Sequence, residues 1–202
     1  MIVYLADLAH DYLPARQFVP LGIGYLASYS KSIFEEKVEF RLFKSVDELL
    51  DACENCKPDL VGFANYTWNE RLTAFAGSKL RESFPNLPIV MGGPNIAIDE
   101  KGIESFLKKN PFIDVYCMYG GEVAFSKIIQ SRLENPFKKD WLNILCADSD
   151  FGGYSLHQGK LVGSANYSVE KDLNFIPSPY LTGVLNPFLK NGFIPIMETN
   201  RG

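Results

Sequence analysis

The sequence contains three short stretches whose residue types suit ligand binding, and each follows an apolar segment. Glycine lets a ligand or another backbone approach closely, and bare backbone N–H groups beside an amide and a hydroxyl suit a phosphate or a large polar ligand tail. Each stretch alone also has the composition of an ordinary tight turn. The three stretches are Asn65-Tyr66-Thr67, Gly92-Gly93-Pro94 and Gly120-Gly121-Glu122.

The elements that must position these stretches alternate regularly along the first 135 residues. Apolar runs predict strands at 2–6, 38–43, 60–64, 89–91 and 115–119, and helical spacing predicts helices at about 20–34, 45–55, 69–84, 100–109 and 123–133. Ser45 and Asn69 are expected to cap the helices at 45–55 and 69–84. This alternation is typical of a doubly wound α/β fold, flavodoxin- or Rossmann-like, with five parallel strands and helices on both faces. Because the carboxyl ends of parallel strands meet at one edge, we expect the three stretches to line one pocket.

The alternation ends after residue 135, and three parts are predicted. Residues 1–135 form the α/β domain. Residues 136–192 form a linker that contains a hairpin at 155–162 and a Pro-rich segment. Residues 193–202 read as one strand at the end of the sequence. An apolar strand without neighbours must fray, dock on its own domain or pair with another chain, so self-association through this strand is expected as one outcome.

Composition restricts the partners. The net charge of −4 argues against nucleic acid, because phosphate binding requires a basic face. No apolar run approaches the roughly 20 residues of a membrane span, which argues against a membrane. The chain begins directly with a strand and lacks the basic region and cleavage site of a signal peptide, so we expect a cytoplasmic location.

Several motifs for other chemistries are missing from the sequence. There is no G-x-G-x-x-G after the first strand and no Walker-type G-x-x-x-x-G-K-[ST]. Only two histidines occur, His10 and His157, which excludes a His-rich metal centre and gives no support to a Ser/His/Asp arrangement. Cys53 and Cys56 form a C-x-x-C at the end of a predicted helix, and we interpret them as small structural residues. Cys117 lies in an apolar predicted strand, and we expect it in the core. No catalytic residue and no metal ligand is predicted.

Two separated parts of the chain resemble one family. The glycine turns at 92–94 and 120–122 resemble those of the cobalamin-binding domain at the N-terminus of B12-dependent radical SAM enzymes. Residues 172–180 are similar to the linker of those proteins, and residues 196–202 look like their first barrel strand. In that family a C-x-x-x-C-x-x-C motif comes next, so the resemblance implies that residues 193–202 begin a radical SAM barrel missing from this sequence.

The resemblance implies a cofactor and its contacts. Cobalamin (B12) would be bound at the strand ends by the nine residues of the three stretches, whereas S-adenosylmethionine and a 4Fe-4S cluster would belong to the missing barrel domain, the expected partner. The reaction would be a methyl transfer or related radical chemistry. Many cobalamin domains supply a cobalt-binding histidine from a D-x-H-x-x-G loop. Here Leu8 and Leu13 replace the flanking Asp and Gly around His10, so we expect a corrinoid without a protein ligand to cobalt.

Two other functions remain open from the sequence. A flavodoxin-like interaction or regulatory module would use the same sheet without any cofactor. A small flavin-binding protein would use the same strand-end pocket and would be yellow when purified. Whether the chain is part of an enzyme is left open, since no catalytic motif lies within it.

Overall fold

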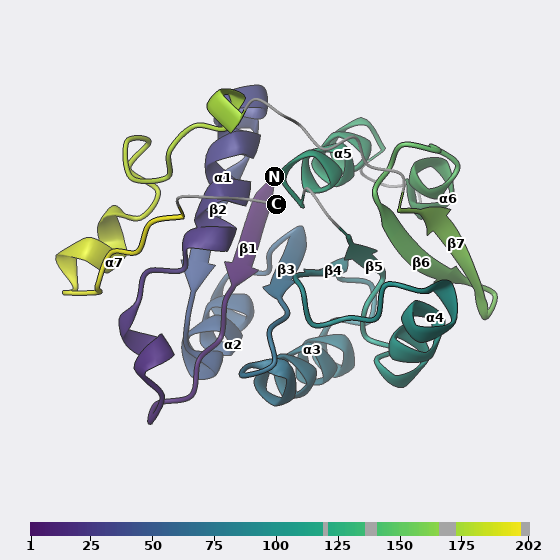
Figure 1. Ribbon diagram of the computed structural model, residues 1–202, viewed down its shortest axis with the longest axis horizontal. Coiled ribbons are helices and arrows are strands. Elements are labelled where there is room, and N and C mark those ends of the chain that lie inside the picture. The colour runs from purple at the N-terminus through teal and green to yellow at the C-terminus, as the bar shows by residue number, and fades with distance from the viewer. Residues whose placement is uncertain (119–120, 136–140, 166–172, 199–202) are drawn as a thin grey trace.

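The computed structural model describes residues 1–118, 121–135, 141–165 and 173–198, and its centre is a sheet of seven strands (Figure 1). The strand order is β2-β1-β3-β4-β5-β6-β7. The strands are β1 Ile2–Ala6, β2 Glu39–Phe43, β3 Leu60–Ala64, β4 Ile89–Gly92, β5 Val115–Cys117, β6 Gly153–His157 and β7 Lys160–Ser164. The first five pair in parallel, as predicted.

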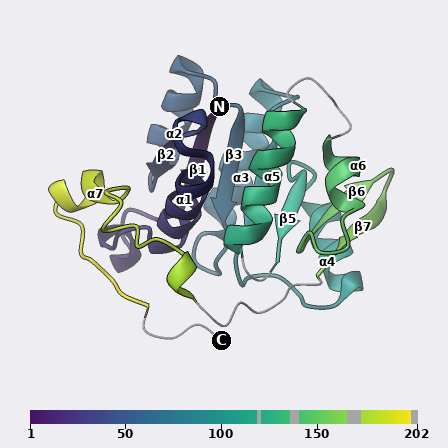
Figure 2. The same ribbon diagram turned by 90° about the horizontal axis from the view of Figure 1, so that it is seen from above.

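The helices form two layers, one on each side of the sheet, as Figures 1 and 2 show. Helices α1, α5 and α6 cover one face, and α2, α3 and α4 cover the other. The α-helices are α1 Leu21–Phe34, α2 Val46–Asn55, α3 Glu70–Ser83, α4 Glu100–Lys109, α5 Gly121–Glu134, α6 Trp141–Cys146 and α7 Asn186–Lys190. Short 3-10 turns lie at Pro14–Gln17, Glu35–Lys37 and Leu173–Phe175. No helix within the described ranges combines the length and apolar character needed to cross a bilayer.

The prediction of five strands is wrong, because the hairpin β6–β7 continues the sheet. Strand β6 pairs antiparallel with β5, with Tyr154 opposite Tyr116 and Gly153 opposite Cys117. Glycine is required at this junction, since a Cβ on Gly153 would lie 2.8 Å from the Tyr116 carbonyl oxygen. The hairpin itself was predicted, but its partner strand lies far back in the chain and leaves no local signal. The boundaries of the three predicted parts stay a prediction.

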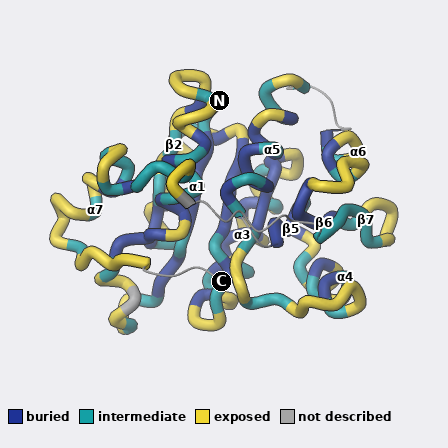
Figure 3. The backbone as a smooth tube through the Cα atoms, turned by 45° about the horizontal axis from the view of Figure 1, so that its top comes forward, coloured by how far each residue is buried: buried dark blue, intermediate teal, exposed yellow. Residues whose placement is uncertain are grey.

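The core follows from alternation along the buried strands. In β1, Tyr4 and Ala6 point towards the α2–α4 layer, whereas Val3 and Leu5 point towards the α1–α5 layer. All four residues are almost fully buried, which is why this strand reads as one continuous apolar run. Figure 3 shows the same distribution, with buried backbone at the centre of the sheet and exposed backbone in many of the outer turns.

Helix starts illustrate how far local rules extend. Ser45 caps α2 as predicted, since its hydroxyl accepts a hydrogen bond from the Glu48 amide. Asp99 caps α4 in the same way through the Gly102 amide. The predicted cap at Asn69 is wrong in its chemistry. Asn69 precedes α3, but its side chain makes no capping bond to that helix and instead accepts a hydrogen bond from the Tyr66 amide at 2.8 Å.

The same aspartate arrangement fixes the amino ends of two strand pairs. The Asp59 amide donates to the Ile2 carbonyl at 2.8 Å, and the Asp59 carboxylate accepts from the Ile2 amide at 2.7 Å. Asp114 forms the same closed ring with Ile89, at 2.8 and 2.7 Å. Each aspartate immediately precedes its own strand, so each ring fixes the register of one parallel pair.

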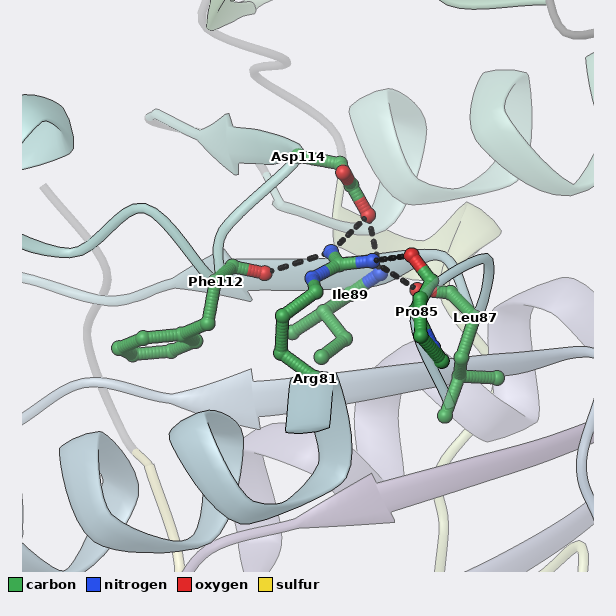
Figure 4. Close-up of polar contacts among 6 residues, drawn as sticks. All are labelled: Arg81, Pro85, Leu87, Ile89, Phe112 and Asp114. Carbon is green, nitrogen blue, oxygen red and sulfur yellow. Dashed lines mark hydrogen bonds and ion pairs between the residues drawn. The ribbon is translucent and has the colours of Figure 1, made fainter. Parts of the chain in front are cut away.

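The Asp114 ring is enlarged by Arg81 from α3 (Figure 4). The guanidinium donates to the Asp114 carboxylate at 2.7 Å and to the Phe112 carbonyl at 2.7 Å. It also donates to the carbonyls of Pro85 and Leu87 at 2.8 and 3.0 Å. One side chain therefore joins the end of α3 to the turns that lead into β4 and β5.

The segment after residue 173 lies against α1 and the β2 edge of the sheet (Figure 1). Leu185 is fully buried against Val19 and Leu21. A Cβ on Gly24 would lie 3.1 Å from Leu185, so the small residue makes room for this contact. Within residues 193–198, the described part of the predicted last strand, the pairing is a single parallel bridge between Ile194 and Phe18. Of the three outcomes predicted for this strand, docking on its own chain is the one seen, and self-association stays a prediction.

Candidate functional site

The direction of the chain reverses between β1 and β3, which lie side by side. After β1 the chain passes to the α1 layer, and after β3 it passes to the α3 layer on the opposite face. In open α/β sheets, ligands bind outside the carboxyl ends of the strands at such a switch point. The loops that follow β1, β3 and β4 therefore form the candidate site.

The loops after β3 and β4 are tied together by the side chain of Asn65. Its amide donates to the Asn95 carbonyl at 2.7 Å and to the Tyr116 hydroxyl at 3.1 Å. The Tyr116 hydroxyl donates in turn to the Gly93 carbonyl at 2.7 Å. Burial raises the pKa of Tyr116 well above its ordinary value, so the hydroxyl stays protonated and remains a donor. Three neighbouring strand ends are thereby held in one arrangement.

Gly93 is required by the protein's own backbone. Its φ is +127°, in the region that only glycine adopts readily, and a Cβ there would lie 2.5 Å from the Asn65 carbonyl oxygen. Gly92 is less constrained, because its nearest neighbour would be the Cys117 carbonyl oxygen at 3.3 Å. Contacts within the protein thus explain why positions 65 and 93 are asparagine and glycine, without reference to a ligand.

The first two turns of α1 lie between two of the predicted stretches. A Cβ on Gly22 would lie 3.4 Å from the Tyr66 hydroxyl, and a Cβ on Gly121 would lie 3.5 Å from the side chain of Leu26. Gly22 was not predicted as a site residue. The signal for it is the presence of two glycines, Gly22 and Gly24, in the first turn of α1, where glycine weakens a helix. Tyr66 stacks on Trp68, with ring centroids 4.4 Å apart and planes at 6°.

The remaining predicted site residues differ in exposure. Thr67, Gly93 and Pro94 are exposed at the carboxyl-end side of the sheet, whereas Glu122 is buried in the first turn of α5. A carboxylate at that position is stabilised by the helix dipole. Gly120 lies outside the described residues. The structure therefore brings the loops after β3 and β4 into direct contact and places Gly121 beside α1.

A buried ion pair at the same edge of the sheet was not predicted. Asp7 follows β1 and Lys44 follows β2, and the carboxylate and ammonium groups are 3.6 Å apart. The Asp7 carboxylate also accepts a hydrogen bond from the Asn69 amide at 3.3 Å. Burial raises the pKa of Asp7, opposed by the charge of Lys44, and burial lowers the pKa of Lys44, opposed by Asp7. The Asp7 carboxylate is therefore held by contacts with Lys44 and Asn69 at the carboxyl ends of the strands.

Histidine and cysteine chemistry is limited in the described part of the chain. His10 stacks on Tyr12, with ring centroids 5.1 Å apart. Burial raises the pKa of Cys53 and of Cys117 to about 12, so both remain neutral thiols and poor nucleophiles. This agrees with the structural interpretation of Cys53 and with the predicted core position of Cys117, which is buried.

Comparison with known proteins gives two curated relatives. The chain is 28% identical over 199 residues to the cobalamin-dependent radical SAM methyltransferase TokK of Streptomyces tokunonensis, a match that covers 92% of this chain and 27% of TokK. It is also 28% identical over 207 residues to the 2-(S-pantetheinyl)-carbapenam-3-carboxylate methyltransferase of Streptantibioticus cattleyicolor, covering 94% of this chain and 28% of that protein. The chain spans about a quarter of the length of these relatives. No protein-family profile matches it.

The fold is similar to part of a solved enzyme. The structure of the cobalamin-dependent S-adenosylmethionine radical enzyme OxsB with aqua-cobalamin and S-adenosylmethionine bound aligns with a TM-score of 0.64 and 17% identity, covering 93% of this chain and 25% of OxsB. The apo form of OxsB aligns with a TM-score of 0.60. At this identity the likeness concerns the fold. Together with the two relatives, it confirms the predicted resemblance to B12-dependent radical SAM enzymes.

Proposed function

We propose that this chain is the cobalamin-binding part of a B12-dependent radical SAM methyltransferase, and that it works in the cytoplasm beside a radical SAM barrel. The observation that carries the proposal is the sequence match over 92% of the chain to a cobalamin-dependent radical SAM methyltransferase. When bound, the corrinoid would supply the methyl-transfer chemistry. S-adenosylmethionine and an iron–sulfur cluster would belong to the barrel domain.

The residues at the switch point fit one side of a large polar cofactor. Exposed Thr67 offers a hydroxyl, Gly93 and Pro94 offer exposed backbone, and Gly22 leaves the start of α1 without a side chain. Asn65 supports this surface from below and is itself fully engaged with the protein. We therefore assign direct contact to Thr67, Gly22 and the backbone of residues 92–94, and a supporting role to Asn65.

A substitution at Gly22 tests the placement of the corrinoid. Gly22→Leu is expected to abolish retention of hydroxocobalamin on a desalting column, because the new side chain would occupy the surface beside Tyr66. The helix itself should gain up to about 1 kcal/mol, since leucine is a much better helix former than glycine. Retention is measured from the visible absorbance of the eluted protein, and stability from urea unfolding.

Lys31→Leu is the matched control, because it adds the same side chain to an exposed position in the last turn of the same helix. It should retain hydroxocobalamin like the unsubstituted chain. Failure of the unsubstituted chain to retain any corrinoid would refute the binding proposal. Retention by Gly22→Leu would refute its placement at α1.

We further propose that cobalt is held without a protein ligand. The Asp7 carboxylate, which could orient an imidazole, is engaged with Lys44 and Asn69. A ligating histidine is normally oriented and made more basic by such a partner. His10→Ala is therefore expected to leave the electron paramagnetic resonance spectrum of bound cob(II)alamin unchanged, including any nitrogen splitting. A nitrogen splitting that disappears in His10→Ala would refute this.

A module without cofactor is the second candidate, and one observation favours it. Gly93 and Asn65 are fully explained by contacts within the protein, so these two residues do not require a ligand. This candidate predicts that neither hydroxocobalamin nor flavin is retained, and that Gly22→Leu is simply a stabilised variant. The same column experiment therefore separates the two functions.

A further inference from the structure

A continuous line of polar contacts crosses the switch point below the candidate site. Lys44 pairs with Asp7 at 3.6 Å, Asp7 accepts from the Asn69 amide at 3.3 Å, and the Asn69 oxygen accepts from the Tyr66 backbone amide at 2.8 Å. We call Lys44, Asp7 and Asn69 the strand-end relay. It joins the ends of β1 and β2 to the loop that carries Tyr66 and Trp68.

Burying the polar groups of the relay costs free energy, so packing alone does not explain their presence. Lys44 is 7% exposed and Asn69 is fully buried, and taking two charged groups out of water often costs as much as their attraction returns. Asn69 also gives up the side-chain bond with which an asparagine before a helix normally caps it. That lost bond is replaced by the bond to the Tyr66 amide, so the relay stabilises the loop in place of the helix.

The bond between Asp7 and Asn69 decides which of two partners the asparagine takes. While the Asn69 amide nitrogen donates to Asp7, its oxygen is aimed back at Tyr66. Without an acceptor at position 7, the side chain can rotate and cap α3, as asparagines at this position usually do. The loop would then lose its anchor, and Tyr66, which stacks on Trp68, would lose its fixed place beside Gly22.

We propose that Lys44, Asp7 and Asn69 are positioning residues that hold the Tyr66–Trp68 pair in the conformation that accepts the ligand. That the relay holds the Tyr66–Trp68 loop in place in the ligand-free protein does not depend on the proposed function. Its effect on ligand affinity rests on the proposed function. The relay acts through the loop and touches no ligand. Its effect should therefore appear first in the environment of Trp68.

The test compares two substitutions of Asp7 in a Trp141→Phe background, so that Trp68 is the single fluorophore of its kind in the sequence. Asp7→Ala removes the acceptor, and the population with a displaced loop should rise about fivefold, the factor that one ordinary hydrogen bond contributes. The measured quantity is the quenching of Trp68 emission by acrylamide. Asp7→Asn keeps an oxygen that can accept from Asn69 and should restore most of the protection.

Two further variants keep the result decisive. Asn69→Ala removes the bond to the Tyr66 amide directly and should increase the quenching as much as Asp7→Ala does. It also serves as the test if Asp7→Ala does not fold. Asp114→Asn disturbs the ion pair between Arg81 and Asp114 at the amino ends of the strands. It should leave the quenching of Trp68 unchanged. Unaltered quenching in both Asp7→Ala and Asn69→Ala would overturn the proposal. So would an equal effect of Asp114→Asn.

Hydroxocobalamin titrations separate this proposal from the proposed function. If the chain binds corrinoid, Asp7→Ala should weaken the affinity by up to about fivefold, and by the full factor only where the displaced loop becomes the main population. If the unsubstituted chain binds none, the proposed function fails while the quenching result still tests the relay. Trp68 is already 45% exposed, so the expected change is a further increase in quenching. If corrinoid binds equally well to all variants although the quenching of Trp68 increases, the relay does not position the ligand site.

Discussion

Alanine at position 93 is expected to lower the free energy of unfolding by about 3 kcal/mol, the sum of an unfavourable backbone conformation and a backbone clash. The φ of Gly93 is +127°, and an added Cβ would lie 2.5 Å from the Asn65 carbonyl oxygen and 2.9 Å from its amide nitrogen. Both neighbours are backbone atoms of a buried strand end, so neither can move aside cheaply. Urea unfolding monitored by circular dichroism measures the loss.

Two other glycines separate the contributions. Gly159→Ala has a φ of +77° with open space around the new Cβ, and should cost only about 1 kcal/mol for the backbone conformation. Gly92→Ala would meet the Cys117 carbonyl oxygen at 3.3 Å and should also cost about 1 kcal/mol or less. If Gly93→Ala were no worse than Gly159→Ala, the close approach of Asn65 would not be the reason for glycine.

Replacement of Arg81 by methionine should cost a similar amount, about 3 kcal/mol, because one change leaves several partly buried acceptors unpaired. The guanidinium serves the carbonyls of Pro85, Leu87 and Phe112 and the carboxylate of Asp114. Arg81 and Asp114 are 25% and 26% exposed, so solvent screens part of the charge interaction and the carbonyls account for most of the loss. The measurement is again urea unfolding.

Lys79→Met is the control for Arg81→Met, since Lys79 belongs to the same helix and forms an exposed ion pair with Glu82 at 3.0 Å. Its cost should stay below about 0.5 kcal/mol. Arg81→Lys should recover little of the loss, because a single ammonium group cannot reach four acceptors that a planar fork serves together. A loss in Arg81→Met as small as in Lys79→Met would contradict the assigned role.

The fold was largely predictable where its signals are local. Each of the first five strands ends in a recognisable turn and is followed by a helix with clear spacing, and the cap at Ser45 follows from four adjacent residues. The hairpin was predicted from its sequence, but its place in the sheet next to β5 was not. The pairing of Tyr116 with Tyr154 depends on the space beside β5, which leaves no local signal. Asn69 shows the opposite case, where a strong local rule loses to a tertiary contact with Asp7.

The candidate site was predictable in place but less so in its chemistry. Glycines after apolar runs indicated the strand ends, and the doubly wound order brings them to one edge. The sequence could not distinguish Gly93, which the backbone of Asn65 requires, from Gly22, which leaves a surface open. Nor could it pair Lys44 with Asp7, since each residue follows a different strand and their contact arises from the parallel pairing of β1 with β2.

The hairpin β6–β7 also has a consequence for aggregation. Without it, the outermost strand would be β5, whose residues Val115–Cys117 are all buried and apolar, and such a free strand is a template for association with other chains. Among the described residues, the hairpin moves the outermost position of the sheet to β7, which begins with Lys160 and contains Gly163 at a φ of +116°. A charged residue on the outermost strand is one of the features with which natural sheets prevent edge-to-edge association. The two added strands thus cover the very apolar β5 and place a more exposed strand at the outer position.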